Sequence, residues 1–325
     1  MPFTASHAAA VLPLVRRDGA GRGPLVASAL VAGSFAPDVP YFAASAAGGL
    51  FVHGQVTHTP WGTVLVDPLV AAALVGVWLA LRGPVAALLS RRWAGRAYAV
   101  LHGRPLRGRP PVAAAAWFWF SAVLGAASHV LWDSFTHPGR WGVRLVPGLD
   151  TVVAGVPAYL VVQYGSSALA LALLGAWCAS AVRRAPDGPL PPGAAPATAW
   201  GRAAARVLVL GCAAAGAVHR CVRYAAVLGD GARTTDFVPT AMFGAGAGLA
   251  AGLLLLAAAA RVRAARVRAA RVRAARVRAG RALPPGARAG RRDGPPAAGA
   301  ADGQWAADSQ SGPTPTETSS GARSG

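Results

Sequence analysis

Five long apolar runs constrain this chain more than any other feature of its sequence. They cover roughly residues 63–81, 112–133, 157–182, 204–222 and 238–260. A run of about 18 or more apolar residues is long enough to cross a bilayer as an α-helix. Only 14% of the 325 residues are charged, whereas soluble domains carry about 25%. The sequence therefore predicts an all-α fold, a polytopic transmembrane bundle of about five spans.

Two features refine this bundle. The stretch 24–36, PLVASALVAGSFA, is apolar but too short to cross a bilayer. We expect a short N-terminal helix there, either re-entrant or packed against the core. The last apolar run carries Gly244, Gly246 and Gly248, and small residues of this kind let a neighbouring helix approach closely.

The arginines predict how the bundle is oriented. Seven lie in 82–111, three in 183–203 and thirteen after residue 260, against two each in 134–156 and 223–237. Because cytoplasmic loops carry the excess of positive charge, we expect the three Arg-rich segments, and with them the C-terminus, on the cytoplasmic face. Three arginines argue against this orientation, because Arg16, Arg17 and Arg22 lie in the part predicted outside.

The sequence after residue 260 differs from the rest of the chain. It first repeats RVRAA and is then dominated by Pro, Gly, Ala, Ser and Thr. Five residues advance about 500° around a helix, so the arginine pairs form no single polar face. From residue 283 onward the composition predicts disorder. We divide the chain into a membrane-embedded domain, 1–260, and an Arg-rich cytoplasmic tail, 261–325.

The tail accounts for much of the formal net charge of +20. It either contacts anionic lipid headgroups or is a tolerated low-complexity expansion. The remaining arginines lie largely in loops that flank apolar runs, as orientation signals do. We therefore expect the lipid bilayer and anionic headgroups as partners, and no nucleic acid.

Ionisable residues recur at helical spacing where the second apolar run ends, in ASHVLWDSFTHPG. His129, Asp133 and His137 are four residues apart, and on a helix this spacing drifts by only about 80° over two turns, so all three can point into one cavity. Pro138 and Gly139 then predict the end of that helix. Ionisable groups in a membrane segment are costly and usually functional, and imidazole with a carboxylate one turn away suits zinc. The alternative is a structural hydrogen-bond network.

A second group of polar residues lies upstream. It comprises His7 in TASHAAAVLP, Asp38 in GSFAPDVPYF, and His53 and His58 in HGQVTHTPWG. Under the orientation above they share the outer face with the end of the second run. Each of these residues has a simpler alternative role. A lone histidine at a membrane boundary often only places a polar side chain at the interface, and Asp38 can simply shape a proline turn.

Several other polar residues stay open or are set aside. Asp67 lies within the first apolar run, and its role is open. The segment VVQYGSS, 161–167, either lines the same cavity or bonds one helix to another. We treat His102 and His219 as non-ligands, because one lies in a basic loop and the other within the fourth run.

Five of these segments carry a resemblance. MPFTASHAAAVLPL, GSFAPDVPYF, THTPWG, GAASHVLWDSFTHPGRWG and YLVVQYGSSALAL occur here in the order found in a bacterial integral membrane family. That family is catalogued as domain of unknown function 4184. The resemblance covers about residues 1–260 and leaves out the Arg-rich tail. It implies the architecture, the motif positions and a multi-pass protein of the bacterial inner membrane, but no activity.

The chain is also distantly similar to bacterial membrane-bound metal-dependent hydrolases. These carry an N-terminal His, a Pro-Asp turn, a Thr-His and a later His-x-x-x-Asp. Carried over by position, the similarity implicates as metal ligands His7, Asp38, His58, His129 and Asp133, and His137 extends the last motif by one turn. The chain departs from the pattern in its acids, because its single glutamate, Glu317, lies in the tail.

These observations lead us to expect a metal-dependent hydrolase at the outer membrane face. The cofactor is a divalent metal, zinc by its donor set, and six ligands leave room for two ions. Asp133 or Asp38 would act as the catalytic base, and the substrate would be a phosphoester or acyl ester of a lipid or lipid-linked molecule. The alternative is a non-enzymatic membrane protein, with a structural metal site, an ion or proton relay, or a scaffold role.

Overall fold

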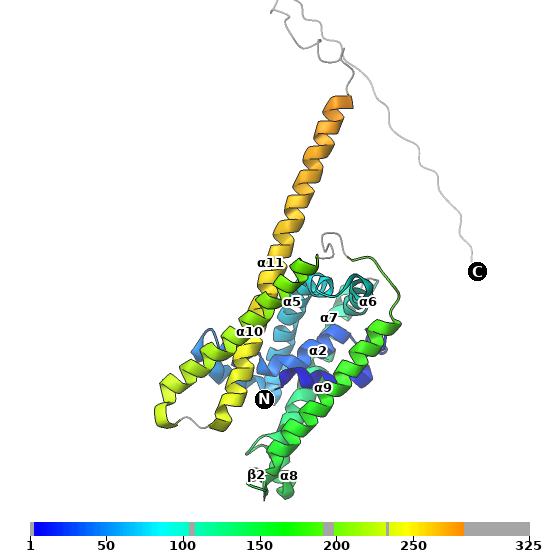
Figure 1. Cartoon of the computed structure of the whole chain (residues 1–325). Helices are drawn as coiled ribbons and strands as arrows, with labels where there is room; N and C mark the ends of the chain where they lie inside the picture. The colour runs from blue at the N-terminus through cyan, green and yellow to red at the C-terminus, as the bar shows by residue number, and fades with distance from the viewer. Residues whose placement is uncertain (1–2, 104–107, 191–197, 232–233, 283–325) are drawn as a thin grey trace, which may run out of the picture. The chain divides into compact units, whose positions relative to one another are not determined.

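The computed structural model describes residues 3–103, 108–190, 198–231 and 234–282, and nearly all of its regular structure is helical (Figure 1). Internal contacts divide the chain into a compact unit, Met1–Arg271, and a second unit, Val272–Gly325. In the described part, strands occur as one short antiparallel hairpin, β1 Val152–Val153 and β2 Val156–Pro157. The predicted all-α fold is confirmed.

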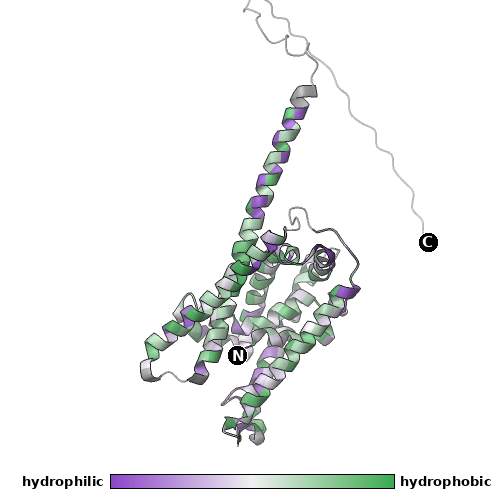
Figure 2. Ribbon diagram, in the orientation of Figure 1, coloured by the Kyte–Doolittle hydropathy of each residue, from purple (hydrophilic) through white to green (hydrophobic). Residues whose placement is uncertain are grey.

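Five helices are long and apolar enough to cross a membrane. They are α5 Asp67–Ala87, which continues the π-helical turn η5 Gly62–Val66, α7 Pro111–Thr136, α9 Ala158–Arg184, α10 Ala199–Leu228 and α11 Thr234–Ala282. Their outer faces expose large apolar side chains, such as Leu69, Leu169 and Val207, and Figure 2 shows apolar colour along these helices. Soluble proteins rarely expose so much apolar surface, whereas lipid covers it in a membrane protein.

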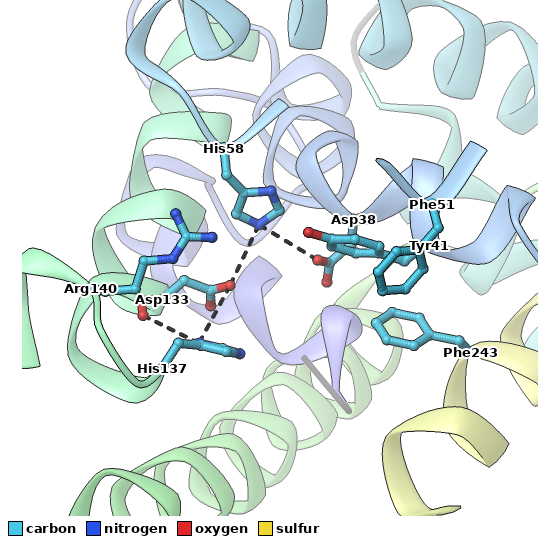
Figure 3. Close-up of a pocket in the computed structure, with 8 residues that line it drawn as sticks. All are labelled: Asp38, Tyr41, Phe51, His58, Asp133, His137, Arg140 and Phe243. Atoms are coloured by element: carbon cyan, nitrogen blue, oxygen red, sulfur yellow. Dashed lines mark hydrogen bonds and ion pairs between the residues drawn. The ribbon is translucent and has the colours of Figure 1, made fainter. Parts of the chain in front are cut away.

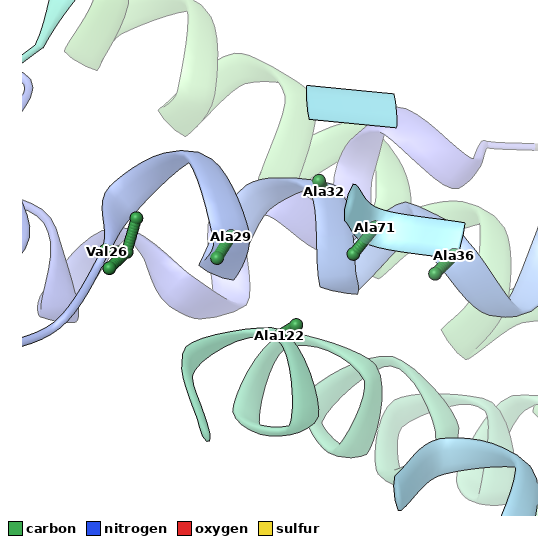
Figure 4. Close-up of a cluster of buried hydrophobic side chains, with 6 residues drawn as sticks. All are labelled: Val26, Ala29, Ala32, Ala36, Ala71 and Ala122. Carbon is green, nitrogen blue, oxygen red and sulfur yellow. The ribbon is translucent and has the colours of Figure 1, made fainter. Parts of the chain in front are cut away.

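The short helix predicted in 24–36 is α2 Ala27–Phe35, and it packs against the core. Its buried alanines face Ala122 of α7 and Ala71 of α5 (Figure 4). Glycines allow α2 and α7 to touch backbone to backbone. A Cβ at Gly33 would lie 2.2 Å from the Ala122 carbonyl oxygen, and one at Gly125 would lie 2.2 Å from the Leu30 carbonyl oxygen.

Short elements surround α2 and connect the long helices. Those before the first long helix are η1 Thr4–His7, α1 Ala8–Val11, η2 Leu12–Leu14, η3 Ala36–Asp38, α3 Val39–Ala43, η4 Gly48–Val52 and α4 His53–Thr57. Those after it are α6 Arg91–His102, α8 Trp141–Leu145, η6 Pro147–Asp150 and η7 Gly229–Gly231. Many of them are single turns, because proline or glycine interrupts them at close intervals.

One of these connections differs from the sequence interpretation. The segment 82–111, expected as an Arg-rich loop, contains the twelve-residue helix α6. Ala94, Gly95 and Ala97 are buried on one side of it, whereas Arg91 and Arg92 are exposed. This amphipathic pattern was hidden by the high density of arginine.

The glycines of α11 pack as the sequence predicts. Gly244 and Gly248 lie against the backbone of α10, at Gly216 and Cys212, and Gly246 lies against the ring of Phe42. The helix then continues through the RVRAA repeat, where polar and apolar residues alternate without a single polar face (Figure 2). The predicted disorder after residue 282 lies outside the described residues.

Candidate metal centre

Two carboxylates and two imidazoles from distant parts of the chain meet in one place. One donor atom each from Asp38, His58, His129 and Asp133 lies within 4.8 Å of the others, and all four residues are buried. Asp38 ends η3, His58 follows α4, and His129 and Asp133 lie one turn apart near the end of α7. Imidazole nitrogens and carboxylate oxygens in such a cluster are the ligands that zinc and similar divalent metals use.

The distances show how the four side chains converge. His129 Nε2 is 3.5 Å from Asp38 Oδ1 and 3.5 Å from Asp133 Oδ2. His58 Nε2 is 3.8 Å from Asp38 Oδ1 and 3.6 Å from Asp133 Oδ2. These separations are too long for hydrogen bonds. They are close to the separation of two ligand atoms that share an ion at about 2.0–2.2 Å.

Neighbouring groups hold each histidine with its metal-binding nitrogen inward. His129 Nδ1 is 2.8 Å from the Ser34 carbonyl oxygen, and His58 Nδ1 is 2.7 Å from the Gly54 carbonyl oxygen. A carbonyl can only accept, so each Nδ1 carries the proton and donates it. Each Nε2 therefore faces the carboxylates and is the nitrogen that would bind a metal. Metal-ligating histidines are oriented in this way by a carbonyl or carboxylate behind them.

Asp38 is arranged in the same manner. The Thr4 hydroxyl donates to Asp38 Oδ2 at 2.5 Å, which fixes the carboxylate and leaves Oδ1 facing the two histidines. Thr57, next to His58, donates to the Pro37 carbonyl oxygen at 2.7 Å. This hydrogen bond links the segment that carries Asp38 to the segment that carries His58.

The hydrogen bonding of the donor atoms that face the centre of the cluster shows whether a cation fits there. Asp38 Oδ1 and His129 Nε2 are buried and have no hydrogen-bond partner within the described residues. Leaving a buried polar group unsatisfied costs about 1–3 kcal/mol, and more for a charged group. A divalent cation among these atoms would remove that cost, so the donor set fits a metal ion.

His7 lies beside this cluster and is completely buried. Its ring stacks on that of His129 with centroids 3.8 Å apart, and its Nε2 is 3.5 Å from Asp133 Oδ1. Neither ring nitrogen has a hydrogen-bond partner among the residues described. Asp133 thus turns one oxygen to His58 and His129 and the other to His7.

His137 differs from the other predicted ligands. The helix α7 ends at Thr136, and His137 is its C-cap residue with an extended backbone, so the helix stops before Pro138 as the sequence predicts. The proline at 138 ends the helix early, because it disfavours helical backbone in the residue before it. His137 Nδ1 still lies 3.7 Å from Asp133 Oδ2, and its Nε2 lies 3.1 Å from Gln163 Nε2.

The ionisation states outside the spans suit metal binding. Burial, together with His129, lowers the pKa of His7 to about 3, and burial also lowers the pKa of His137. Burial opposes ionisation of Asp38, but the adjacent His129 outweighs it and lowers the pKa of that carboxyl to about 2. At neutral pH these residues are therefore neutral imidazoles and a carboxylate anion, the forms that bind metals.

A small cavity opens beside the cluster (Figure 3). Its volume is about 120 Å³. Its polar wall includes the clustered side chains Asp38, His58 and Asp133, and its other lining residues are Tyr41, Phe51, His137, Arg140 and Phe243. The donor set is therefore not enclosed, because it faces a space that a small molecule can enter.

The other polar residues singled out in the sequence lie elsewhere. His53, His102 and His219 are exposed. Asp67 is completely buried in α5, and neither of its carboxylate oxygens has a hydrogen-bond partner in the described part of the chain. Ser166 accepts a hydrogen bond from Trp132 at 3.2 Å and so joins α9 to α7.

Sequence reasoning missed several residues of the site. Thr4, which fixes Asp38, and Arg140, which lines the cavity, both lie within the quoted motifs but were not singled out. Thr4 is one turn before His7, and Arg140 directly follows the Pro-Gly turn, so their positions were the available signal. No sequence signal connects Phe243 with the site, because it comes from a helix far along the chain.

Comparison with known proteins gives a family. No curated protein and no solved structure is significantly similar to this chain. Residues 1–258 match the family described as Domain of unknown function (DUF4184). This range includes the metal-centre residues and four of the five apolar helices, together with much of the fifth. The chain therefore belongs to the DUF4184 family.

Proposed function

We propose that this protein is a membrane-bound metal-dependent hydrolase that acts on an ester of a lipid or lipid-linked molecule. One observation carries the proposal: a buried set of two aspartates and two histidines faces an open cavity, and Asp38 Oδ1 and His129 Nε2 in it have no hydrogen-bond partner in the described part of the chain. Structural zinc sites are closed by their ligands, whereas catalytic sites keep a position open to solvent or substrate. The cavity beside Asp38, His58 and Asp133 favours the catalytic kind.

The residues divide into ligands and supporting groups. His58 and His129 supply nitrogen, Asp38 and Asp133 supply oxygen, and His7 and His137 flank Asp133 on its two sides. The mixed nitrogen and oxygen donors favour zinc over calcium or magnesium, which prefer oxygen alone. His7 and Asp133 Oδ1 supply two further donors, so a second ion is compatible with this donor set.

The chemistry follows from these groups. A bound divalent metal polarises the ester and makes water a better nucleophile. The oxygen of water forms the new bond, and the bond to the alcohol oxygen breaks with its electron pair on that oxygen. The alcohol ends with the proton that water loses. Asp38 and Asp133 line the cavity, and we assign one of them as the base that carries this proton.

The position of the site favours a substrate that lies in the membrane. His58 precedes α5, His129 and Asp133 end α7, and Gln163 lies near the start of α9. The Arg-rich segments follow α5 and α9, at the opposite ends of these helices. By the excess of positive charge in cytoplasmic loops, we place the site at the outer face of a bacterial inner membrane and the C-terminus in the cytoplasm.

A second candidate function is an ion or proton relay without hydrolysis. Asp67 favours it, because this carboxylate is completely buried within a spanning helix and has no hydrogen-bond partner in the described part. Buried carboxylates in spanning helices often mark such pathways. An Asp67→Asn variant separates the two functions: a hydrolase keeps its metal and its ester cleavage, whereas a relay loses its transport current.

The decisive experiment measures metal and hydrolysis on the same preparations. The full chain is purified in detergent, its metals are counted by mass spectrometry, and long-chain nitrophenyl acyl and phosphate esters are offered in micelles. We expect about one or two zinc ions per chain and cleavage of one ester class. Asp133→Asn and His129→Ala should lose both.

The matched control is His53→Ala. His53 lies in the same short helix region as His58, but its side chain is exposed, so metal and cleavage should both persist. A wild-type chain that holds no metal after zinc loading, or an Asp133→Asn variant that cleaves as fast as wild type, would refute the proposal. Bound metal without cleavage of either ester would favour a structural site.

A further inference from the structure

The cavity beside the metal centre holds one permanently charged cation, Arg140. It is the only arginine among the lining residues, and its guanidinium has no hydrogen bond or ion pair with the residues described, although two carboxylates line the same cavity. Figure 3 shows its guanidinium directed toward the space next to His58 and Asp133. An arginine held at a cavity without a protein partner is available to a ligand.

The local fold places Arg140 there. Gly139, with φ of 70°, reverses the chain directly after α7, and Arg140 then begins the short helix α8 as its N-cap residue. Gly142 of α8 lies so close to α7 that a Cβ would be 2.6 Å from the Ser134 carbonyl oxygen. The backbone of Arg140 is therefore fixed above the last turn of α7, which carries Asp133.

The charges in the cavity indicate an anionic ligand. The carboxylates of Asp38 and Asp133 match one divalent cation, so Arg140 leaves the occupied site with a surplus positive charge. A neutral acyl ester has no group for that charge, whereas a phosphoryl group has several anionic oxygens. Guanidinium binds phosphate oxygens in a bidentate fork. Tyr41, on the same wall, offers a phenol hydroxyl as a further donor.

The size of the cavity limits what else the ligand can carry inside. About 120 Å³ holds a few water molecules, at about 30 Å³ each, and is far below the 300–1,000 Å³ of typical small-molecule pockets. A phosphoryl group fits in this space. The remainder of a larger ligand can extend past the rim, because the cavity is open on one side.

That rim is apolar. Phe51 and Phe243 line the cavity, and Phe51 is 53% exposed. Its neighbours Leu50 and Val52 are 39% and 56% exposed, and Val56 is 48% exposed. All belong to η4 and α4, which precede the first span at the end of the bundle where the metal centre lies. An exposed apolar rim at a membrane face suits a lipid chain.

We propose that the substrate is a phosphate monoester of an apolar alcohol, with its phosphoryl group between Arg140 and the metal centre and its apolar chain against Phe51 and Phe243. This inference rests on the proposed hydrolase function and names its substrate. In the reaction, the oxygen of water bonds to phosphorus and the bond from phosphorus to the alcohol oxygen breaks. The electron pair stays on the alcohol oxygen, which takes the proton, so the products are the free alcohol and inorganic phosphate.

The first test is binding of inorganic phosphate to the zinc-loaded full chain in detergent, by calorimetry. Arg140→Gln should weaken phosphate binding by about 10- to 100-fold, the loss expected for charge-assisted hydrogen bonds, with unchanged zinc content. Arg144→Gln is the matched control, because Arg144 lies in the same short helix but is exposed. Equal phosphate affinity in wild type and Arg140→Gln would overturn the proposal.

The second test separates a lipid from a soluble source of the phosphate. A long-chain alkyl phosphate in micelles and glycerol phosphate in solution are offered to wild type and to Phe51→Ser. We expect the alkyl phosphate to be cleaved at least about 10-fold better in kcat/KM, a difference of about 1.4 kcal/mol, with Phe51→Ser lowering only that value. Equal cleavage of both, unaffected by Phe51→Ser, would overturn the apolar-alcohol assignment.

Ester cleavage and phosphate binding together show which of the two proposals fails. If acyl esters are cleaved and phosphate esters are not, and Arg140→Gln changes nothing, the hydrolase stands and the phosphate assignment is refuted. If zinc and phosphate bind through Arg140 but no ester of either class is cleaved, the hydrolase is refuted and the site is a phosphate receptor.

Discussion

The Nδ1 atom of His129, in α7, donates to the carbonyl oxygen of Ser34, in α2, at 2.8 Å. This bond ties the metal centre to the contact between the two helices. Gly125, one turn before His129, makes the contact possible, because a Cβ there would lie 2.2 Å from the Leu30 carbonyl oxygen and 2.8 Å from the Ser34 nitrogen. The orientation of a ligand therefore depends on a residue that touches no ligand.

Gly125→Ala should consequently weaken metal binding. The new methyl group pushes α2 and its Ser34 carbonyl away from His129, and loss of such a supporting bond costs about 10- to 100-fold in metal affinity. Competition with a fluorescent zinc chelator measures it. Gly76→Ala, in α5, is the control, because a Cβ at Gly76 meets no atom within 4 Å. An unchanged affinity in Gly125→Ala would show that α2 does not orient the ligand.

Thr4→Val should weaken both the metal site and the fold. Thr4 donates to Asp38 Oδ2 at 2.5 Å in a fully buried setting, and valine removes the donor while keeping the shape. The unsatisfied carboxylate oxygen costs about 1–3 kcal/mol, visible as a lower midpoint of thermal unfolding after chelation. Thr151→Val is the control, because its hydroxyl donates to the nearby Gly148 carbonyl in an exposed setting. Equal midpoints for the two variants would contradict this role.

Arg220→Met should disturb substrate binding while leaving the metal in place. From α10, Arg220 donates to the Tyr41 carbonyl and the Ser45 hydroxyl, both at 2.6 Å, and lies 5.3 Å from the Phe243 ring centroid. It thus holds two residues of the cavity wall and contacts no metal-centre residue. We expect KM for a long-chain ester to rise about 10-fold, the effect of losing charged hydrogen bonds, with zinc content unchanged. Arg223→Met, at an exposed position in α10, should leave both KM and zinc content unchanged.

Much of this site is visible in the sequence, because its side chains carry their own signal. Histidine and aspartate are costly in apolar segments, so His129 and Asp133 draw attention wherever the chain places them. The order of the helices then brings His7, Asp38 and His58 to the same end of the bundle. The five apolar runs likewise predict the five long helices, because their length alone distinguishes them from soluble helices.

The remainder depends on contacts that no spacing encodes. The bonds from His129 to Ser34 and from His58 to Gly54 end on backbone carbonyls, and any residue type supplies a carbonyl. The sequence predicts a loop where α6 forms, because the buried face of this helix is made of alanine and glycine, which carry little apolar signal. Arg140 became distinctive only when the turn at Gly139 placed it over the cavity.

His7→Gln should change how stability depends on pH. Burial lowers the pKa of His7 from 6.5 to about 3, so the unfolded chain binds a proton at this side chain in the window between these values and the folded chain does not. Stability from this residue is therefore present above about pH 6.5 and is lost as the pH falls toward about 3. In chelator-treated protein, the unfolding midpoint of wild type should fall more steeply between pH 7 and pH 4 than that of His7→Gln.

The slope difference between the two proteins isolates His7, because both retain the other titrating groups that face it, Asp38, His129 and Asp133. Parallel curves would mean that His7 keeps an ordinary pKa. His53→Gln controls for the loss of a histidine as such, since that side chain is exposed and its replacement should leave the slope unchanged.

Replacing the arginines of the RVRAA repeat should weaken binding to anionic membranes without affecting the metal centre. Eight arginines lie at 261, 263, 266, 268, 271, 273, 276 and 278, on the exposed C-terminal part of α11. Because they surround the helix, only some can face a lipid surface at once. At about 1 kcal/mol for each arginine near an anionic surface, even three or four contacts give a strong, salt-sensitive attraction.

We expect the full chain, held in discs of neutral lipid, to pull down vesicles containing phosphatidylserine. The variant with glutamine at all eight positions should lose this vesicle binding at equal zinc content. Vesicle binding that survives the substitutions would leave the repeat as a low-complexity expansion without a lipid partner.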